Sequence, residues 1–218
     1  MIKAAVFDLD GTLMDTLTDL HIAVNRALAA FSLPAVTTDK VRASVGNGVS
    51  KLIERCLDFE HKNLHRQVLE RFNAEYALCK EDNTAPFEGV TDTLSALKRM
   101  RIAVAVVSNK TESAVKSLCG DEFGELVDIA VGDDGVRPLK PDPAPVLYAL
   151  EKLGVSIRDA VYIGDQEVDV ITARNSGIRL IAAGWGFRGE RALKDAGAET
   201  VISNVRELIP LISAAQKE

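Results

Sequence analysis

The sequence is poor in several residues on which particular classes of protein depend. Its 218 residues include three cysteines, three histidines and one tryptophan, and aromatic residues make up only 5%. Cys56, Cys79 and Cys119 are odd in number and far apart, so they form neither a disulfide framework nor a metal-binding pattern. The histidines have no partner at ligand spacing, which leaves zinc chemistry without support.

Long apolar runs and an excess of positive charge are also missing. The longest apolar runs, such as residues 102–107, fall far short of the roughly 20 residues that span a bilayer, so no membrane partner is expected. Lys and Arg number 26 against 32 Asp and Glu, a formal net charge of -6, which argues against binding to nucleic acid. We find no secretory signal before the strand-like run that begins at Ile2 and expect a cytoplasmic location.

The sequence does have the composition and pattern of a globular α/β protein. Hydrophobic residues make up 47% and charged residues 27%, which is ordinary globular usage. Short apolar runs predict strands at 4–7, 102–107, 127–131, 160–163, 178–182 and 200–202. Helical patterns separate them at 90–100, 112–119, 143–153, 167–175, 190–196 and 205–215. This alternation predicts a doubly wound, mostly parallel sheet with helices on both faces.

A long helical stretch interrupts this alternation directly after the first strand. From about residue 15 to residue 80, apolar residues such as Leu17, Leu20, Val24 and Leu28 recur at three- and four-residue spacing, and no convincing strand is found. We therefore predict an inserted α-helical cap over the strand ends, where it would exclude water. The predicted domains are a catalytic core of residues 1–14 and 82–218 and a helical cap of residues 15–81.

Four polar stretches follow predicted strands or precede predicted helices. Parallel sheets place their ligand sites at the carboxyl ends of the strands, so we expect these stretches to share one site. They are Asp8-Leu9-Asp10-Gly11-Thr12, Ser108-Asn109-Lys110, Lys140-Pro141-Asp142-Pro143 and Gly164-Asp165-Gln166-Glu167-Val168-Asp169.

Each stretch suits phosphate chemistry, and each also has an ordinary structural explanation. Paired carboxylates such as Asp165 and Asp169, one helical turn apart, suit a cation, but acidic residues also complement a helix N-terminus. Ser108 and Lys140 suit phosphate oxygens, but a serine also caps helices and a lysine is usually solvated. An Asp-Gly-Thr sequence is common in turns. Four such stretches in the expected places favour a functional site.

Taken together, these residues resemble the four motifs of the haloacid dehalogenase superfamily, and the resemblance covers essentially the whole chain. It implies a Rossmann-like core, and the helical insert resembles the superfamily's type-1 cap. Val45-Gly46-Asn47-Gly48 resembles the substrate-facing loop of phosphoglycolate phosphatases, and Trp185-Gly186-Phe187 is also similar to those enzymes. Gln166 departs from their pattern, because they usually carry Ser or Thr after the metal-binding Asp.

The resemblance implies a role for each matching residue. Asp8 is expected to be the nucleophile that forms an aspartyl-phosphate, and Asp10 the acid and base. Mg²⁺ is the implied cofactor, held by the Asp8 carboxylate, the Asp10 main-chain carbonyl and Asp165, with Asp169 in support. Ser108 and Lys140 are expected to act in catalysis. The residues expected to bind substrate are Thr12, Ser108, Asn109, Lys140 and, from the cap, Asn47.

The expected function is Mg²⁺-dependent hydrolysis of the phosphate monoester of a small metabolite, foremost phosphoglycolate, by a monomer or homodimer. A sugar-phosphate or nucleotide phosphatase, a pyrophosphatase and a β-phosphoglucomutase-like phosphomutase fit the same motifs and remain alternatives. A dehalogenase of this fold would need neither Asp10 nor a Mg²⁺ site. A phospho-accepting signalling receiver would lack the helical insert.

Overall fold

The computed structural model describes residues 1–79 and 82–216, in two compact units. The core unit consists of Met1–Leu13 and Pro86–Glu218, and the helical insert consists of Met14–Ala85. The sequence predicts the corresponding boundaries at 14/15 and 81/82, and the roles of cap and catalytic core stay predictions. The last predicted cap residues, 80–81, and the last two core residues, 217–218, lie outside the described residues.

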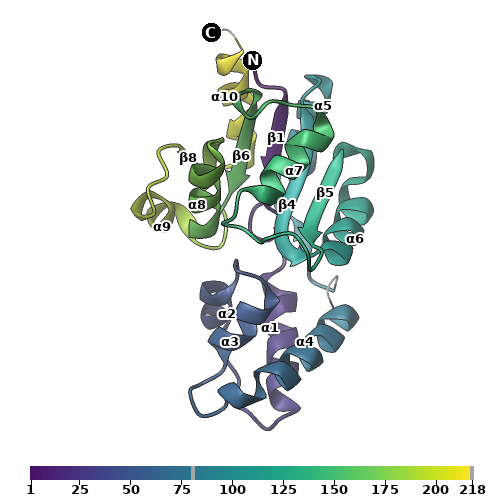
Figure 1. Ribbon diagram of the computed structural model, residues 1–218, viewed down its shortest axis with the longest axis vertical. Coiled ribbons are helices and arrows are strands. Elements are labelled where there is room, and N and C mark those ends of the chain that lie inside the picture. The colour runs from purple at the N-terminus through teal and green to yellow at the C-terminus, as the bar shows by residue number, and fades with distance from the viewer. Residues whose placement is uncertain (80–81, 217–218) are drawn as a thin grey trace. The chain divides into compact units, whose positions relative to one another are not determined.

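A parallel sheet forms the centre of the core unit (Figure 1). Over the described residues it has six strands in the order β5-β4-β1-β6-β7-β8, and all of its neighbouring strands run parallel. The first strand of the chain is therefore central, with Ala4 opposite both Ala103 and Ala160. The strands are β1 Ala4–Phe7, β4 Ala103–Thr111, β5 Ile129–Asp133, β6 Ala160–Gly164, β7 Arg179–Ala183 and β8 Val201–Ile202.

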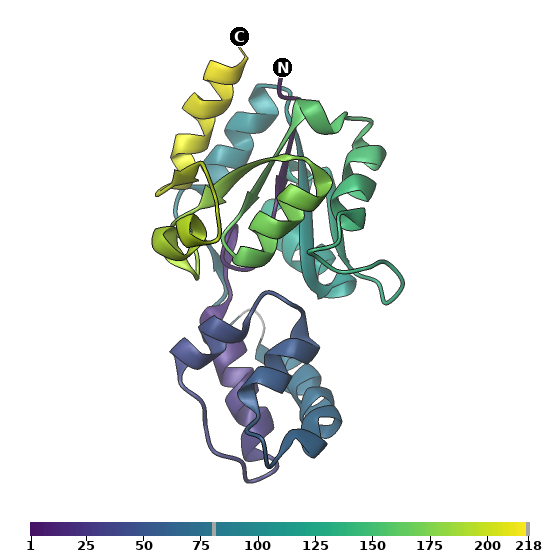
Figure 2. The same ribbon diagram turned by 60° about the vertical axis from the view of Figure 1, so that its left-hand side comes forward.

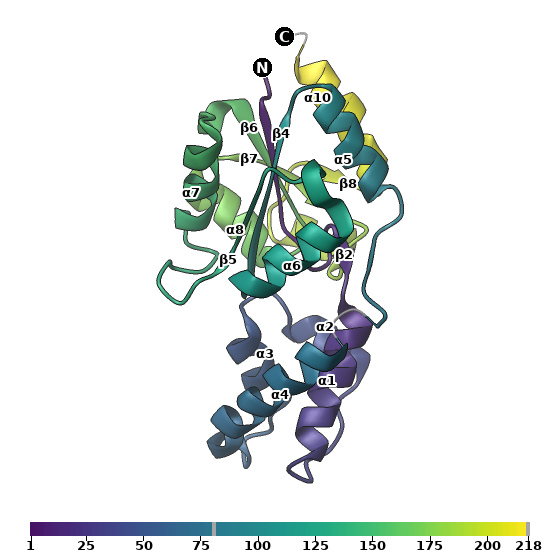
Figure 3. The same ribbon diagram turned by 90° about the vertical axis from the view of Figure 1, so that its right-hand side faces the viewer.

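Helices cover both faces of this sheet (Figure 3), which confirms the predicted doubly wound fold. Ala4 and Val6 of β1 pack in one apolar cluster with residues of α7 and α8, and alternation along the strand turns Ala5 and Phe7 to the other face. Figure 2 shows the C-terminal helix α10 beside α5. The helices are α5 Val90–Arg99, α6 Glu112–Phe123, α7 Ala144–Leu153, α8 Glu167–Ser176, α9 Gly189–Asp195 and α10 Leu208–Ala215. The described residues of the core unit also form the short 3-10 helices η2 Gly124–Leu126, η3 Ile157–Asp159 and η4 Val205–Glu207.

The helical insert has its own apolar core. Leu20, Val24 and Leu28, which carry the predicted helical spacing, are all buried in α1. α1 packs mainly on α4, where the rings of Phe72 and Tyr76 stack 5.5 Å apart. Its helices are α1 Leu17–Ala29, α2 Thr38–Ser44, α3 Val49–Cys56, η1 Lys62–Leu64 and α4 His65–Cys79. Over the described part of the chain, no helix is both long and apolar enough to cross a membrane.

The two connections of the insert form a small sheet that the sequence does not predict. β2, Met14–Asp15, pairs with β3, Ala85–Pro86. Beside this pair, the Phe87 N–H donates to the Leu13 carbonyl at 3.0 Å. Two-residue strands leave no periodic signal, which explains why the sequence pattern misses them. The insert therefore begins and ends at one place on the core unit.

β4 is longer than its apolar run. The prediction ends this strand at residue 107, whereas the structure continues it to Thr111 through an irregular register after Val107. Ser108, Asn109 and Lys110 are each only 6% exposed. Because these three residues are polar, the sequence predicts a loop here. In the structure their side chains contact other polar groups inside the core unit, and the backbone remains extended and buried.

Candidate active site

The loop after β1 turns sharply at Gly11. Its φ of 88° lies in the left-handed region, where a side chain is strained. A Cβ at this position would also clash with the carboxyl group of Asp165. The Asp8 N–H donates to the Ile163 carbonyl of β6 at 2.8 Å, which places Asp8 beside the end of that strand. The glycine of the first motif thus lets the loop and Asp165 approach each other.

Asp8, Asp165 and Asp169 form a buried acidic cluster. One carboxylate oxygen from each residue lies within 4.8 Å of those from the other two. These three side chains form the candidate metal-binding group found among residues 1–79 and 82–216. Asp165 is held from two sides, because it accepts hydrogen bonds from Thr12 Oγ1 at 3.1 Å and from the Phe187 N–H at 2.8 Å. The cluster is therefore fixed by the surrounding chain.

The segment Trp185-Gly186-Phe187 packs against this cluster. Trp185 Nε1 donates to the Thr12 carbonyl at 3.0 Å. Gly186 lies so close to Asp165 that a Cβ would overlap it. This segment, which the sequence suggests only through the family resemblance, holds Asp165 in place together with Thr12.

Lys140 joins the cluster through all three of its ammonium N–H groups. Its Nζ lies 2.8 Å from Asp8 Oδ1, 2.8 Å from Asp169 Oδ1 and 3.0 Å from the Tyr162 hydroxyl oxygen. The Tyr162 hydroxyl in turn donates to Asp169 Oδ1 at 2.9 Å. Two hydrogen bonds and the ion pair with Asp8 together hold the ammonium group in this position.

The last residues of β4 connect these groups to one another. Asn109 clamps the main chain of Lys140, because its Nδ2 donates to the Lys140 carbonyl at 2.9 Å and its Oδ1 accepts from the Lys140 N–H at 2.8 Å. Ser108 Oγ accepts from the Lys110 N–H at 3.2 Å. Lys110 Nζ donates to the two oxygens of Asp10 at 2.9 and 3.3 Å.

When ionised, the carboxyl groups of the cluster carry more negative charge than the Lys140 ammonium group can balance. Burial raises the pKa of the Asp8 carboxyl to about 7, with Asp169 adding to the rise and Lys140 opposing it. Burial likewise raises the pKa of Asp165 well above its ordinary value, and the Asp8 and Asp169 carboxylates raise it further. The pKa of Lys140 lies well above its usual range, because the attraction of Asp169 and Asp8 outweighs the opposing effect of burial. One ammonium group thus does not offset the three carboxylates around it.

The donor set fits a divalent cation such as Mg²⁺. Four buried carboxyl groups, those of Asp8, Asp10, Asp165 and Asp169, face the two ammonium groups of Lys110 and Lys140. When all four are ionised, they leave an excess of two negative charges that a divalent cation would balance. Carboxylate oxygens are the ligands that hard divalent cations prefer. Asp8 and Asp165 would hold such a cation, with Asp169 beside them.

The structure brings most of the sequence-predicted residues together. Within the core unit, the contacts described above connect Asp8, Asp10, Thr12, Ser108, Asn109, Lys140, Asp165 and Asp169. Asn47 belongs to the helical insert, where its Oδ1 accepts from Arg55 Nη2 at 2.7 Å, and its role in substrate binding stays a prediction.

Two residues that contact this network have no individual role assigned from the sequence, although one of them belongs to the polar stretch 108–110. They are Lys110 and Tyr162, whose signals in the sequence are weak. Lys110 stands at the end of a buried strand, and Tyr162 places a hydroxyl group among the apolar residues of β6. A buried polar group needs a hydrogen-bond partner. A polar side chain in a buried strand therefore indicates that other polar groups lie near it.

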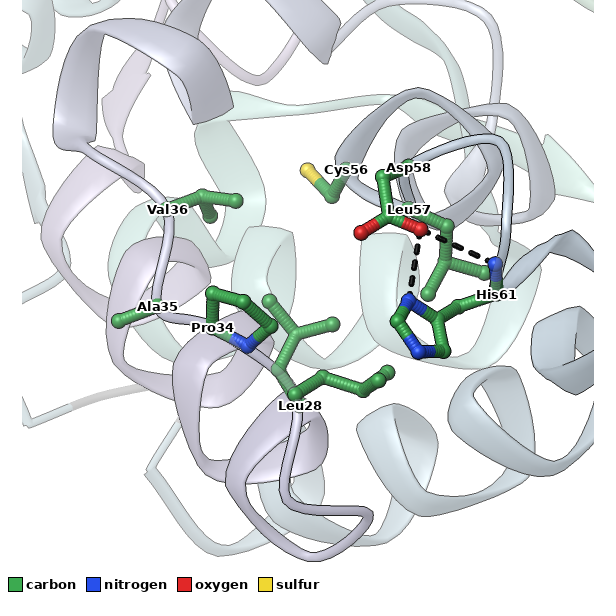
Figure 4. Close-up of a pocket in the computed structure, with 9 residues that line it drawn as sticks. Leu28, Pro34, Ala35, Val36, Cys56, Leu57, Asp58 and His61 are labelled. Carbon is green, nitrogen blue, oxygen red and sulfur yellow. Dashed lines mark hydrogen bonds and ion pairs between the residues drawn. The ribbon is translucent and has the colours of Figure 1, made fainter.

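A separate pocket in the helical insert has a different character (Figure 4). It has a volume of about 140 Å³ and is lined mainly by apolar side chains, including Leu28, Pro34 and Leu57. Its polar groups are Asp58 and His61, which pair with each other at 2.7 Å. The described lining contains neither lysine nor arginine.

Comparison with known proteins identifies the family. The model of the haloacid dehalogenase-like hydrolases matches residues 5–183. The chain belongs to this family. Phosphoglycolate phosphatase 1 of Pseudomonas aeruginosa is 34% identical to this hydrolase over 98% of the chain and 80% of the relative. Phosphoglycolate phosphatase of Haemophilus influenzae (strain 86-028NP) is 33% identical over 96% of the chain and 98% of the relative.

A solved structure supports the same relationship. A phosphoglycolate phosphatase candidate from Lactobacillus delbrueckii subsp. bulgaricus superposes on this haloacid dehalogenase-like hydrolase with a TM-score of 0.88. It is 32% identical, and the match covers 94% of this chain and 96% of that structure. The family resemblance seen in the sequence is therefore confirmed, and the buried Asp8, Asp165 and Asp169 cluster fits a metal site.

Proposed function

We propose that this hydrolase is a Mg²⁺-dependent phosphatase that cleaves the phosphate monoester of a small metabolite through an aspartyl-phosphate on Asp8. The observation that carries the proposal is the buried cluster of Asp8, Asp165 and Asp169, with Lys140 Nζ 2.8 Å from Asp8. Phosphoglycolate is the first candidate substrate, because relatives 33–34% identical over nearly the whole chain are named phosphoglycolate phosphatases.

In the proposed first step, the Asp8 carboxylate attacks phosphorus. The bond from phosphorus to the ester oxygen breaks, and Asp10 gives a proton to the departing oxygen. Two like charges 4 Å apart repel by about 4 kcal/mol at an effective dielectric of 20, so an anionic nucleophile needs positive charge around it. Lys140, which Asn109, Asp169 and Tyr162 hold in place, supplies one such charge. A bound Mg²⁺ would supply further charge for the phosphate and the nucleophile.

In the proposed second step, water attacks the aspartyl-phosphate. Asp10, now a carboxylate, takes a proton from the water, the bond between phosphorus and Asp8 breaks, and phosphate leaves. Asp8 is regenerated as a carboxylate. Asp10 must therefore hold a proton in one step and accept one in the other, which requires an environment distinct from that of Asp8. Asp10 contacts Lys110, whereas Asp8 contacts Lys140, so the two carboxyl groups have different surroundings.

The contacts also suggest how the other predicted residues act. Ser108, at the end of β4, is proposed to bind phosphate oxygens. Thr12 Oγ1 donates to Asp165, and both ends of the Asn109 amide contact the Lys140 main chain. We therefore propose Thr12 and Asn109 as residues that position a carboxylate and a lysine. The substrate role of Asn47 in the helical insert is kept as part of the proposal.

Phosphate release from a panel of esters tests this function. The panel contains phosphoglycolate, hexose phosphates, nucleoside monophosphates and pyrophosphate, each measured with Mg²⁺ and with a chelator. We expect release that requires Mg²⁺ and is fastest with phosphoglycolate. Asp8→Asn should abolish release. The matched control is Asp159→Asn, which alters a surface carboxylate paired with Lys3 and should leave the rate unchanged.

Each other outcome has a defined meaning. A preference for another ester keeps the mechanism and changes the substrate. Full activity in Asp8→Asn, or release that a chelator does not affect, contradicts the mechanism. Absence of release from every ester, together with transfer of phosphate between two positions of a hexose phosphate, favours the phosphomutase alternative.

A further inference from the structure

Lys110 and Asp10 form a buried ion pair to which the family motifs assign no role. Lys110 Nζ contacts both oxygens of Asp10, at 2.9 and 3.3 Å. Only 5% of the Lys110 side chain and 13% of the Asp10 side chain are exposed. The two residues come from β4 and from the loop after β1, so the contact joins neighbouring strands at the edge that carries the acidic cluster.

Stability alone does not explain this pair. Removing two charges from water costs about as much as their attraction returns, so a buried ion pair is weak evidence for a stabilising role. A charge pair that contacts both oxygens of a carboxylate does fix the rotation of that carboxylate. The pair is therefore suited to hold the orientation of Asp10.

The main chain beneath Lys110 is also held in place. The Lys110 N–H donates to Ser108 Oγ at 3.2 Å, and the residue between them clamps the main chain of Lys140. Two successive residues of β4 thus fix two different groups of the site. Asn109 positions the lysine that contacts Asp8, and Lys110 contacts the carboxylate of Asp10.

We propose that Lys110 is a positioning residue that orients the Asp10 carboxyl group for proton transfer to the departing ester oxygen. The inference rests on the proposed function, in which Asp10 protonates that oxygen. In this proposal Lys110 acts on the carboxyl group of Asp10, and not on the phosphorus or on the bond that breaks. Its effect on the reaction must therefore pass through Asp10.

The leaving group of the ester provides the test. An alkyl ester such as phosphoglycolate leaves as a basic alkoxide that needs a proton, whereas p-nitrophenyl phosphate leaves as a stable anion that does not. A positioned acid contributes about 10²–10⁴-fold to a step that needs it. We expect Lys110→Met to lower kcat/KM by about tenfold or more for phosphoglycolate, and by less than about threefold for p-nitrophenyl phosphate.

A double-mutant cycle shows whether the effect passes through Asp10. Asp10→Asn alone should produce the same dependence on leaving group. The double variant Asp10→Asn/Lys110→Met should be no slower with phosphoglycolate than Asp10→Asn alone. The double variant also guards against unfolding, because it leaves neither charge buried without a partner. Thermal unfolding is recorded for every variant.

Lys98→Met is the matched control. Lys98 of α5 pairs with Asp128, which directly precedes β5, and both side chains are about one third exposed. This variant should leave kcat/KM unchanged for both esters. Equal losses on the two esters in Lys110→Met, or losses that multiply in the double variant, would overturn the positioning role. A wild-type protein without Mg²⁺-dependent activity would instead overturn the proposed function and this inference with it.

Discussion

The hydroxyl group of Tyr162 lies between two charged groups and contacts both. It accepts from Lys140 Nζ at 3.0 Å and donates to Asp169 Oδ1 at 2.9 Å. Tyr162 itself is fully buried, and burial raises the pKa of its hydroxyl well above the usual range, so the group keeps its proton. The tyrosine thus links the lysine and the carboxylate without adding a charge.

Tyr162→Phe should therefore destabilise the protein without changing its shape. The ring stays, but a buried N–H of Lys140 loses its acceptor, which costs about 1–3 kcal/mol. Urea denaturation measures this loss. Tyr148→Phe is the control, because Arg137 stacks on the Tyr148 ring and the substitution keeps that contact; its effect should stay within about 0.5 kcal/mol. Equal effects of the two substitutions would contradict the account of Tyr162.

The raised pKa of Asp8 predicts how pH and Mg²⁺ act together. Without a cation, burial raises this pKa from its ordinary 3.8 to about 7. The folded protein therefore keeps a proton in this range that the unfolded chain has lost. The stability contributed by that proton is complete below pH 3.8 and is lost as pH rises through about 7.

A divalent cation must displace this proton. The rise in Tm on adding Mg²⁺ should therefore be small near about pH 6 and larger near about pH 8, because metal binding requires the ionised ligand. Thermal unfolding at both pH values, with and without Mg²⁺, measures the difference. In Asp8→Asn this pH dependence should become smaller, and the part that remains would come from Asp165, whose pKa burial also raises. A wild-type shift of the same size at both pH values would argue against Asp8 as a ligand.

At this scale, the sequence predicts residues that belong to a spaced motif better than residues that act through one contact. Asp8 and Asp165 directly follow strands and Lys140 precedes a helix, each in a recognisable pattern, and the structure brings them together. Lys110 and Tyr162 depend on contacts with residues of other elements, which are Asp10 for Lys110 and both Lys140 and Asp169 for Tyr162. Such contacts form only when the elements come together in the fold, so the local sequence around each residue does not predict them.

At the scale of elements, the turn after β7 shapes the candidate metal site. Gly186 is packed against Asp165 and the Gly11 carbonyl. Its φ is not in the left-handed region, so the reason for glycine is the close approach and not the backbone conformation. An added methyl group must push the Asp165 carboxyl away from its hydrogen bond with Phe187.

Gly186→Ala should therefore weaken Mg²⁺ binding by about 10–100-fold, the usual effect of disturbing the groups that orient a ligand. Calorimetric titration with Mg²⁺ measures this affinity. Gly120→Ala is the matched control, because Gly120 lies within α6 with open space around it. That substitution should leave Mg²⁺ affinity unchanged and stabilise the protein by about 0.5–1 kcal/mol. Unaltered affinity in Gly186→Ala would show that Asp165 does not bind the cation.

The elements themselves were largely predictable, and the exceptions have a common cause. The apolar strands and amphipathic helices carry periodic patterns, so β6 and α7 appear within one residue of their predicted bounds. β4 runs four residues beyond its prediction, to Thr111. The last part of β4 is polar and contacts Asp10 and Lys140 inside the core unit. A prediction based on the spacing of hydrophobic residues does not detect a buried strand made of polar residues.

At the scale of the whole molecule, the core unit is assembled from two separate parts of the chain. β1 lies between β4 and β6, so the first residues supply the centre of a sheet whose other strands follow the insert. The insert closes on itself, because the buried Asp19 of α1 accepts from the N–H of Asn83 and the hydroxyl of Thr84. Each unit thus contains the contacts that complete its own core.

This arrangement predicts that the core unit folds without the insert. Leu13 and Phe87 are joined by a hydrogen bond of 3.0 Å, so a short glycine-serine linker can replace residues 14–85 without moving either end. Shortening a closed loop also lowers the entropy cost of closing it. We expect a folded variant with the far-UV spectrum of an α/β protein and a lower urea m-value, since less surface is exposed on unfolding.

The same variant separates what each unit does. Asp8, Asp165 and Lys140 all belong to the core unit, so Mg²⁺ should still raise its Tm, and Asp8→Asn in the shortened chain should reduce the pH dependence of that rise. If the insert supplies substrate contacts through Asn47, the preference for phosphoglycolate over p-nitrophenyl phosphate should fall. A shortened chain that folds but does not respond to Mg²⁺ would mean that the insert contributes to the metal site.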